Sequence, residues 1–211
     1  MKKILSLILI VLILYCGINL VLSPHKISKI KSNIDPLTLV NYNHALGDYK
    51  INLVTFNGFK VCDIIYNDLV DMTNAAKKDG ITLKINNSYR TAEDQRDMFD
   101  AKRQTYLNQG YSYEKATYKA KETAQLPGYS EHQTGLAIDF SNEGHPDDNQ
   151  KIWQWLKENS YKYGFILRYP NGKEDITKIT YEPWHFRYVG KKAAKEITKQ
   201  NITLEEYLKG K

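Results

Sequence analysis

The chain has 211 residues, of which 42% are hydrophobic and 26% are charged, so it is neither a disordered chain nor a small disulfide scaffold. Its length suffices for one domain with a substantial core and leaves room for an anchor or a tail. The formal net charge of +6 is a weak indication of nucleic acid, and it suits anionic lipid or an anionic cell wall equally well. Because the chain also lacks a Gly-rich phosphate loop and any nucleic-acid motif, we expect no nucleic-acid partner.

The chain opens with two lysines and an uncharged run of 19 residues, 4–22, with the sequence ILSLILIVLILYCGINLVL. An α-helix needs about 20 apolar residues to cross a bilayer, whereas the core of a secretory signal has roughly 7–15. Pro24 should hinder signal cleavage after Ser23. We therefore predict a membrane anchor over residues 1–23, with a single pass through the cell membrane and the rest of the chain extracytoplasmic. A cleaved signal, or a lipoprotein signal at Cys16, is the alternative.

Residues 24–47 contain prolines and no clean hydrophobic period, so they predict a tether or an early docking segment ahead of a domain over residues 48–211. Within this domain, apolar spacing together with cap and stop residues predicts helices at 63–78, 91–110, 112–126, 149–159, from 191 onward and at 204–208. Short apolar or alternating runs predict strands at 81–85, 136–140, 165–168 and 184–189. Helices separate the short strands without a regular βαβ rhythm, so the predicted fold class is α+β.

Two segments combine imidazoles and carboxylates in apolar surroundings: SEHQTGLAID at 130–139 and EPWHFRY at 182–188. Catalytic zinc needs three nitrogen or oxygen ligands, an open fourth position and a nearby base. Two histidines and one carboxylate of these segments could be the ligands, and the remaining carboxylate could be the base. An unpaired carboxylate in an apolar strand is costly, so burial of Asp139 implies either a counter-charge or a metal partner.

Local geometry limits how these residues can meet. His132 and Asp139 are seven residues apart and would face opposite sides of a regular strand, so we expect a bend at Gly135 to bring them together. Pro183 lies between Glu182 and His185 and is incompatible with a helix interior. This pair is therefore predicted to lie on a loop that leads into a strand.

The pattern Ser-x-His-x6-Asp, followed by Glu-Pro-Trp-His-Phe-Arg-Tyr, resembles the VanY-type zinc D-alanyl-D-alanine carboxypeptidases and their L,D-carboxypeptidase relatives. The segment Ser-Tyr-Arg-Thr at 88–91, with Gln95 five residues after the arginine, is similar to a third motif of that family. The resemblance spans roughly residues 48–190. It implies an α+β domain with a small central antiparallel sheet flanked by helices, and one zinc ion as cofactor.

The resemblance also implies a role for each matched residue. The zinc ligands would be His132, Asp139 and His185. Glu182 would be the general base that activates water, and Arg90 would stabilise the carbonyl oxygen as it becomes an oxyanion. The remaining matched positions are predicted to contact substrate: Ser130, Gln95, Ser88, Tyr89 and Trp184.

Taken together, these implications describe a membrane-anchored zinc carboxypeptidase that trims the terminal D-alanine from peptidoglycan stem peptides. L,D-carboxypeptidase action on tetrapeptide stems is the main alternative among enzymes. A wall endopeptidase is a third possibility, which a site closed around a free carboxylate would disfavour. A catalytically inactive wall-binding module is the alternative outside enzymes, and the presence of all three ligands, the base and the arginine argues against it.

Overall fold

The computed structural model describes residues 31–142 and 145–210. The predicted anchor over residues 1–23 lies outside these ranges. Within them, no helix is long and apolar enough to cross a membrane. The described residues form one compact unit.

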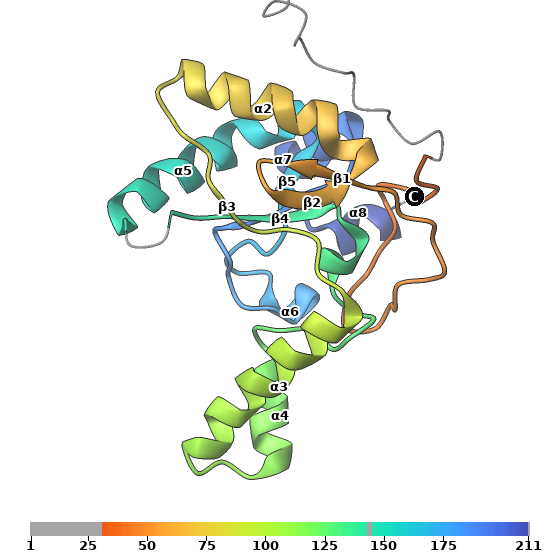
Figure 1. Cartoon of the computed structure of the whole chain (residues 1–211), viewed down its shortest axis with the longest axis vertical. Coiled ribbons are helices and arrows are strands. Elements are labelled where there is room, and N and C mark those ends of the chain that lie inside the picture. The colour runs from red at the N-terminus through yellow and green to blue at the C-terminus, as the bar shows by residue number, and fades with distance from the viewer. Residues whose placement is uncertain (1–30, 143–144, 211) are drawn as a thin grey trace, which may run out of the picture. The chain divides into compact units, whose positions relative to one another are not determined.

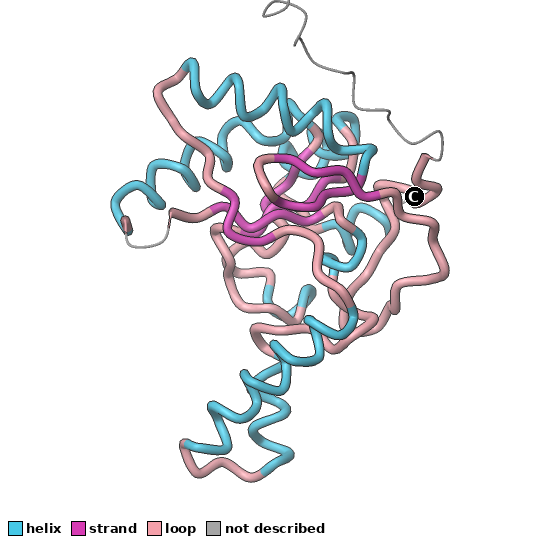
Figure 2. The backbone as a smooth tube through the Cα atoms, viewed as in Figure 1, coloured by secondary structure: helices cyan, strands magenta, loops and turns pink. Residues whose placement is uncertain are grey.

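A small antiparallel sheet forms the centre of the described domain (Figure 2). Its strand order is β3 (Ile85–Asn87), β4 (Ala137–Phe140), β6 (His185–Tyr188) and β5 (Phe165–Leu167). A separate antiparallel hairpin consists of β1 (Leu53–Phe56) and β2 (Phe59–Cys62). The helices are α2 (Tyr66–Lys78), α3 (Ala92–Asn108), α4 (Tyr113–Lys121), α5 (Pro146–Asn159), α6 (Glu174–Thr177), α7 (Lys191–Gln200) and α8 (Leu204–Lys209), with 3-10 turns at Asp63–Ile65, Glu131–Thr134 and Ser160–Tyr163. The predicted α+β class with a central antiparallel sheet is therefore confirmed.

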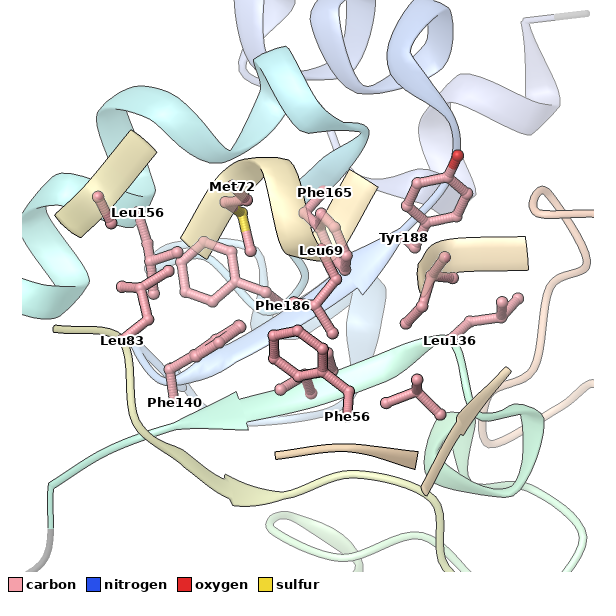
Figure 3. Packing of buried hydrophobic residues seen from close by; sticks show 14 of the residues in the cluster. Phe56, Leu69, Met72, Leu83, Leu136, Phe140, Leu156, Phe165, Phe186 and Tyr188 are labelled. Atoms are coloured by element: carbon pink, nitrogen blue, oxygen red, sulfur yellow. The ribbon is translucent and has the colours of Figure 1, made fainter. Parts of the chain in front are cut away.

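The sheet has an apolar face and a polar face because side chains alternate along each strand. Ile138 and Phe140 of β4 and Phe186 of β6 belong to the main core, together with residues of α2 and α5 (Figure 3). In Figure 1, α2 and α5 lie on the same side of the sheet. Asp139 and His185 are paired directly across β4 and β6, so both side chains point to the other face. Because side chains alternate along the strands, the core residues lie on one face of the sheet and the candidate site lies on the other.

Helix caps define the α3–α4 hairpin, which extends away from the sheet (Figure 1). The Thr91 hydroxyl accepts from the backbone N–H of Asp94, and the Asp94 carboxylate accepts from the backbone N–H of Thr91. Ser112 caps α4 by accepting from the Lys115 N–H. These bonds satisfy N–H donors that a helix start leaves free, so both predicted helix starts are confirmed.

The strand predicted at 81–85 is wrong in position, because pairing with β4 begins only at Ile85 and continues to Asn87. Residues 81–84 are not part of a strand, although the Lys84 carbonyl oxygen accepts from the Ser141 N–H (3.1 Å), and Leu83 is buried in the main core. Their alternation therefore reflects burial of one side of an extended chain. The β1–β2 hairpin was not predicted, although its turn, Asn57-Gly58, has the sequence and the positive φ angles, 49° and 87°, of a two-residue hairpin turn.

The described part of the predicted tether packs on the domain. Ile34 and Val40 are buried, with 4% and 0% of their surface exposed. Arg187 of β6 donates to the carbonyl oxygens of Pro36 (3.1 Å) and Thr38 (2.7 Å). Residues 31–47 therefore behave as a docking segment of the compact unit.

Candidate active site

Two strands and one tight turn bring the three predicted metal ligands together. Asp139 and His185 face each other across β4 and β6. His132 comes from the 3-10 turn ahead of β4, and Gly135 ends that turn in the left-handed region, with a φ of 67°. A β-carbon at Gly135 would lie only 2.8 Å from the backbone nitrogen of Cys62, so both conformation and space require glycine there. The predicted bend is confirmed.

The spacing of the ligand atoms fits a single zinc ion. His132 Nε2 lies 3.4 Å from Asp139 Oδ2, and His185 Nδ1 lies 3.0 Å from Asp139 Oδ1. One ligand atom from each of the three residues can be chosen so that all lie within 4.8 Å of one another. A tetrahedral ion with bonds of about 2.0–2.1 Å places its ligand atoms roughly 3.3 Å apart. Asp139 Oδ1 is also buried without a hydrogen-bond partner among the described residues, as expected of an atom that serves a metal.

Within the trio of His132, Asp139 and His185, neighbouring charges shift the pKa values of Asp139 and His185. Burial by itself would raise the pKa of Asp139, but the imidazoles of His132 and His185 outweigh it and hold that pKa well below its usual value. Asp139 is therefore ionised, which is the form that binds a metal. Burial acts to lower the pKa of His185, while contacts with Asp139 and Glu131 raise it to about 9. With that pKa, the His185 ring carries a second proton at neutral pH when no metal is bound. A bound cation would replace this proton, because metal ligation needs the neutral ring.

Outer contacts orient two of the ligands. His132 Nδ1 donates to the carbonyl oxygen of Ser88 (2.7 Å), which leaves Nε2 free to face Asp139. Asp139 Oδ2 also accepts from the Asn87 side-chain amide (3.1 Å). Contacts of this kind fix ring tautomer and ligand direction in metal sites. Sequence reasoning missed this contact, because no local pattern singles out Asn87 as a partner of Asp139.

Glu182 lies beside the trio without belonging to it. It sits on the loop before β6, as predicted, and its Oε2 is 3.7 Å from His185 Nδ1. Its side chain is 12% exposed. Burial, reinforced by the charge of Asp139, raises the pKa of Glu182 to about 7 against the opposing charges of His185, Lys102 and Arg90. A carboxylate with a pKa near neutrality can both take and return a proton at physiological pH.

Arg90 is fixed by Gln95. Arg90 Nη1 donates to Gln95 Oε1 (2.6 Å), while the Gln95 amide donates to the carbonyl oxygen of Gln125 (2.6 Å). The Arg90 backbone N–H donates to the carbonyl oxygen of His132 (3.2 Å). Burial lowers the pKa of Arg90, and the nearby acids Asp139, Asp94 and Glu182 oppose this. An arginine keeps its charge under these conditions, so the site contains a positioned guanidinium.

These residues line one pocket of about 300 Å³. Of the predicted substrate contacts, Ser130, Gln95 and Trp184 line it, whereas Ser88 and Tyr89 are not among its lining residues. The Ser88 hydroxyl donates to the carbonyl oxygen of Lys60 (2.8 Å), so Ser88 meets the site through its own carbonyl oxygen instead. Lining residues that sequence reasoning missed are Met98, Lys102, Thr123, Ala124, Gln125, Glu131, Tyr169, Ile179 and Thr180.

Size alone does not identify this pocket. A larger cavity, about 460 Å³, is lined in part by residues of β5 and α7. In the described part of the chain, the one candidate metal group is His132, Asp139 and His185, and all three line the smaller pocket. The candidate site is therefore identified by the metal-ligating residues that line it, and not by the volume of the cavity.

A buried ionic network adjoins the trio. Glu131 pairs with Arg168 (2.7 Å) and Arg187 (2.8 Å), and Arg168 also pairs with Glu205 of α8 (2.6 Å). Burial would raise the pKa of Glu131, but the two arginines and His185 hold it far below its usual value. The sequence signal for such a network was the presence of two arginines in apolar strand segments, where each needs a counter-charge. Which acids would supply it was not evident from the sequence.

Two imidazoles and one carboxylate lie around a common point, with a second carboxylate and a guanidinium in the same pocket, an arrangement typical of metal-dependent hydrolases. The family described as VanY, D-alanyl-D-alanine carboxypeptidase, matches residues 59–191, and the chain belongs to this family. The resemblance drawn from the sequence motifs is therefore confirmed.

Individual relatives agree with this membership. A D-alanyl-D-alanine carboxypeptidase of Enterococcus faecalis is 40% identical over 174 residues, which cover 82% of this chain and 65% of the relative. A solved variant of the vancomycin resistance D,D-pentapeptidase VanY, in complex with Zn(II), is 40% identical, with a TM-score of 0.78 and coverage of 82% of this chain and 98% of that chain. The LdcB LD-carboxypeptidase is 41% identical, with a TM-score of 0.62 and coverage of 82% and 87%. The chain spans less than two thirds of the length of the curated relatives that it matches, with 65% for the first and 50% for a Bacillus subtilis relative.

Proposed function

We propose that this chain is a zinc-dependent D-alanyl-D-alanine carboxypeptidase that removes the terminal D-alanine from peptidoglycan stem peptides. The observation that carries the proposal is the presence of Glu182 and Arg90 in the same pocket as the trio of His132, Asp139 and His185. Support comes from two solved relatives, one in complex with Zn(II) and one, VanYB, in complex with D-alanine-D-alanine, each 40% identical to this chain.

His132 Nε2, an Asp139 oxygen and His185 Nδ1 would hold one zinc ion. When bound, zinc supplies a Lewis acid that polarises the scissile carbonyl and lowers the pKa of water to about 7. Glu182 takes the proton of the attacking water as the new C–O bond forms. It then gives that proton to the amine of D-alanine as the C–N bond breaks.

Arg90 and Ser130 act on other parts of the substrate. The Arg90 guanidinium is already held by Gln95, so it donates to the carbonyl oxygen as negative charge develops there, with little reorganisation. Ser130, which is 5% exposed, contacts the terminal residue from the pocket wall. Trp184 lines the same pocket, and its ring lies 5.9 Å from that of Trp153, an arrangement that suits a rigid wall.

We also propose that residues 4–22 anchor the protein in the cell membrane, with the catalytic domain extracytoplasmic and facing the wall. The support is the uncharged run of 19 residues and the proline that follows it. In fractionated cells the protein should sediment with membranes and resist an alkaline wash. A soluble product that starts near Ser23 or Pro24 would instead indicate a cleaved signal.

The activity is tested by incubating the full chain, loaded with zinc, with matched pentapeptide and tetrapeptide stems and identifying the products by mass. We expect the pentapeptide to lose one D-alanine and the tetrapeptide to remain intact. Glu182→Gln is the inactive control. Shortening of the tetrapeptide alone would establish L,D-carboxypeptidase action, and a zinc-loaded chain that cleaves neither stem would be a binding module.

A further inference from the structure

Glu131 is the centre of the buried network behind the metal ligands, and one of its oxygens is already occupied. Arg168 Nε donates to Glu131 Oε1 (2.7 Å), and Arg187 Nη1 lies 2.8 Å from the same oxygen. Both arginine side chains are 0% exposed. Two fixed guanidinium groups therefore hold the carboxylate in one orientation, which also fixes where its second oxygen points.

That second oxygen faces a metal ligand. Glu131 Oε2 lies 3.6 Å from His185 Nε2, slightly beyond hydrogen-bond range. Both atoms are buried, and neither has a hydrogen-bond partner among residues 31–142 and 145–210. Buried polar atoms are nearly always paired in native proteins, and a small rotation of the ring would pair these two.

The opposite nitrogen of the same ring belongs to the metal centre, because His185 Nδ1 lies 3.0 Å from Asp139 Oδ1. A neutral imidazole carries hydrogen on only one nitrogen, so Nδ1 can bind a metal only when the hydrogen is on Nε2. An acceptor next to Nε2 favours that tautomer. The ring of Tyr169, 4.9 Å from that of His185, further restricts its orientation.

We propose that Glu131 is a positioning residue of the metal centre: its Oε2 accepts the Nε2–H of His185 and so holds the ring in the tautomer and direction in which Nδ1 can bind zinc. The inference rests on the proposed zinc function. His132 is held by an equivalent contact, in which its Nδ1 donates to the carbonyl oxygen of Ser88 (2.7 Å). Each imidazole would then have one nitrogen for the ion and the other for a fixed acceptor.

Glu205 offers a matched control within the same network. It accepts from Arg168 Nη1 (2.9 Å) and Nη2 (2.6 Å), so its loss unbalances the same buried arginine. Among the described residues, the acids that lie close to His185 are Asp139, Glu131 and Glu182, and Glu205 is not one of them. A purely structural role for the network predicts similar consequences from both substitutions, whereas the proposal assigns metal affinity to Glu131.

The test compares Glu131→Gln and Glu205→Gln in the full chain. The zinc dissociation constant is measured by competition with a chromophoric chelator, and folding is checked by circular dichroism at the same temperature. Glu131→Gln should raise the zinc dissociation constant about 10–100-fold, the usual effect of losing an outer partner of a ligand. Glu205→Gln should keep the wild-type constant. Unchanged zinc affinity in Glu131→Gln, or an equal loss in both variants, would overturn the proposal.

If Glu131→Gln does not fold, Glu131→Asp carries the test, because it keeps the charge between the arginines but shortens the reach to His185. It should bind zinc more weakly than wild type, and wild-type affinity would overturn the proposal. Nitrogen NMR of the His185 ring in the zinc-loaded protein supplies an independent readout: in wild type Nδ1 should be the metal-bound nitrogen and Nε2 should carry a hydrogen-bonded proton, and in the variant that Nε2–H signal should move toward the position of an N–H without an acceptor. No peptide is used, so a wild type that binds zinc but does not cleave stems would refute the proposed function alone.

Discussion

Glu182→Gln and Asp139→Asn should separate the base from the ligands. Both substitutions replace a carboxylate by an amide of nearly equal size. Asp139 reaches both imidazoles, with 3.0 Å from Oδ1 to His185 and 3.4 Å from Oδ2 to His132, whereas Glu182 approaches only His185, at 3.7 Å. A neutral amide is a poor zinc ligand. We therefore expect Asp139→Asn to lose zinc and Glu182→Gln to retain close to one equivalent.

The expected loss of turnover in Glu182→Gln follows from its role and its burial. Removal of a general base usually lowers the rate by about 10²–10⁴, equivalent to roughly 2.7–5.5 kcal/mol of activation free energy. Because the Glu182 side chain is only 12% exposed, bulk water cannot easily replace it as proton acceptor, which favours the upper half of that range. Asp139→Asn should lose activity in proportion to its metal content.

The assay measures zinc content and D-alanine release for both variants side by side. Saturating zinc should restore part of the activity of Asp139→Asn and none of that of Glu182→Gln. If Glu182→Gln loses its zinc while Asp139→Asn keeps it, the two roles are reversed. A Glu182→Gln enzyme with wild-type turnover would remove Glu182 from the chemistry altogether.

Three further outcomes are expected. Chelation of the purified protein should abolish D-alanine release and added zinc should restore it; full turnover in a metal-free preparation would contradict the zinc site. Gly135→Ala should lower the free energy of unfolding by at least about 1–3 kcal/mol, because a β-carbon there would lie 2.8 Å from the Cys62 nitrogen. Urea titrations measure this change. Gly172 also has a positive φ (80°) but has open space around it, so Gly172→Ala should lower the free energy of unfolding by less. Burial would raise the pKa of Glu205, but the charge of Arg168 outweighs burial and lowers that pKa in the folded protein. The stability that Glu205 contributes should therefore be present above its unfolded pKa of about 4.3, and it should be lost as pH falls through the lower folded pKa. Glu205→Gln should therefore show a weaker decline of stability in acid than wild type, and an identical slope would argue against this pair as a source of acid sensitivity.

Local signals in the sequence predicted most elements near the site. The cap residues Thr91 and Ser112 set the starts of α3 and α4, because a side-chain oxygen at that position satisfies free N–H groups whatever the tertiary fold. Gly135 was expected to bend the chain, and it does so in a conformation that other residues rarely adopt. The extended run at 81–85 was misplaced as a strand, since strand pairing depends on a partner that the run itself does not specify.

The sequence by itself determined the chemistry available to this protein: the histidine and carboxylate ligands, the additional carboxylate and the arginine all lie within short motifs whose residue types suit zinc hydrolysis. Only the tertiary structure decided how these groups are supported. Glu131 and Glu205 both meet Arg168 across 37 residues of chain, and Asn41 donates to Glu205 across 164. Such partners are selected by burial, because a charged group removed from water needs an opposite charge wherever the fold can bring one. No local pattern in the sequence encodes that choice. Only the folded chain brings Glu131 next to His185 and between Arg168 and Arg187.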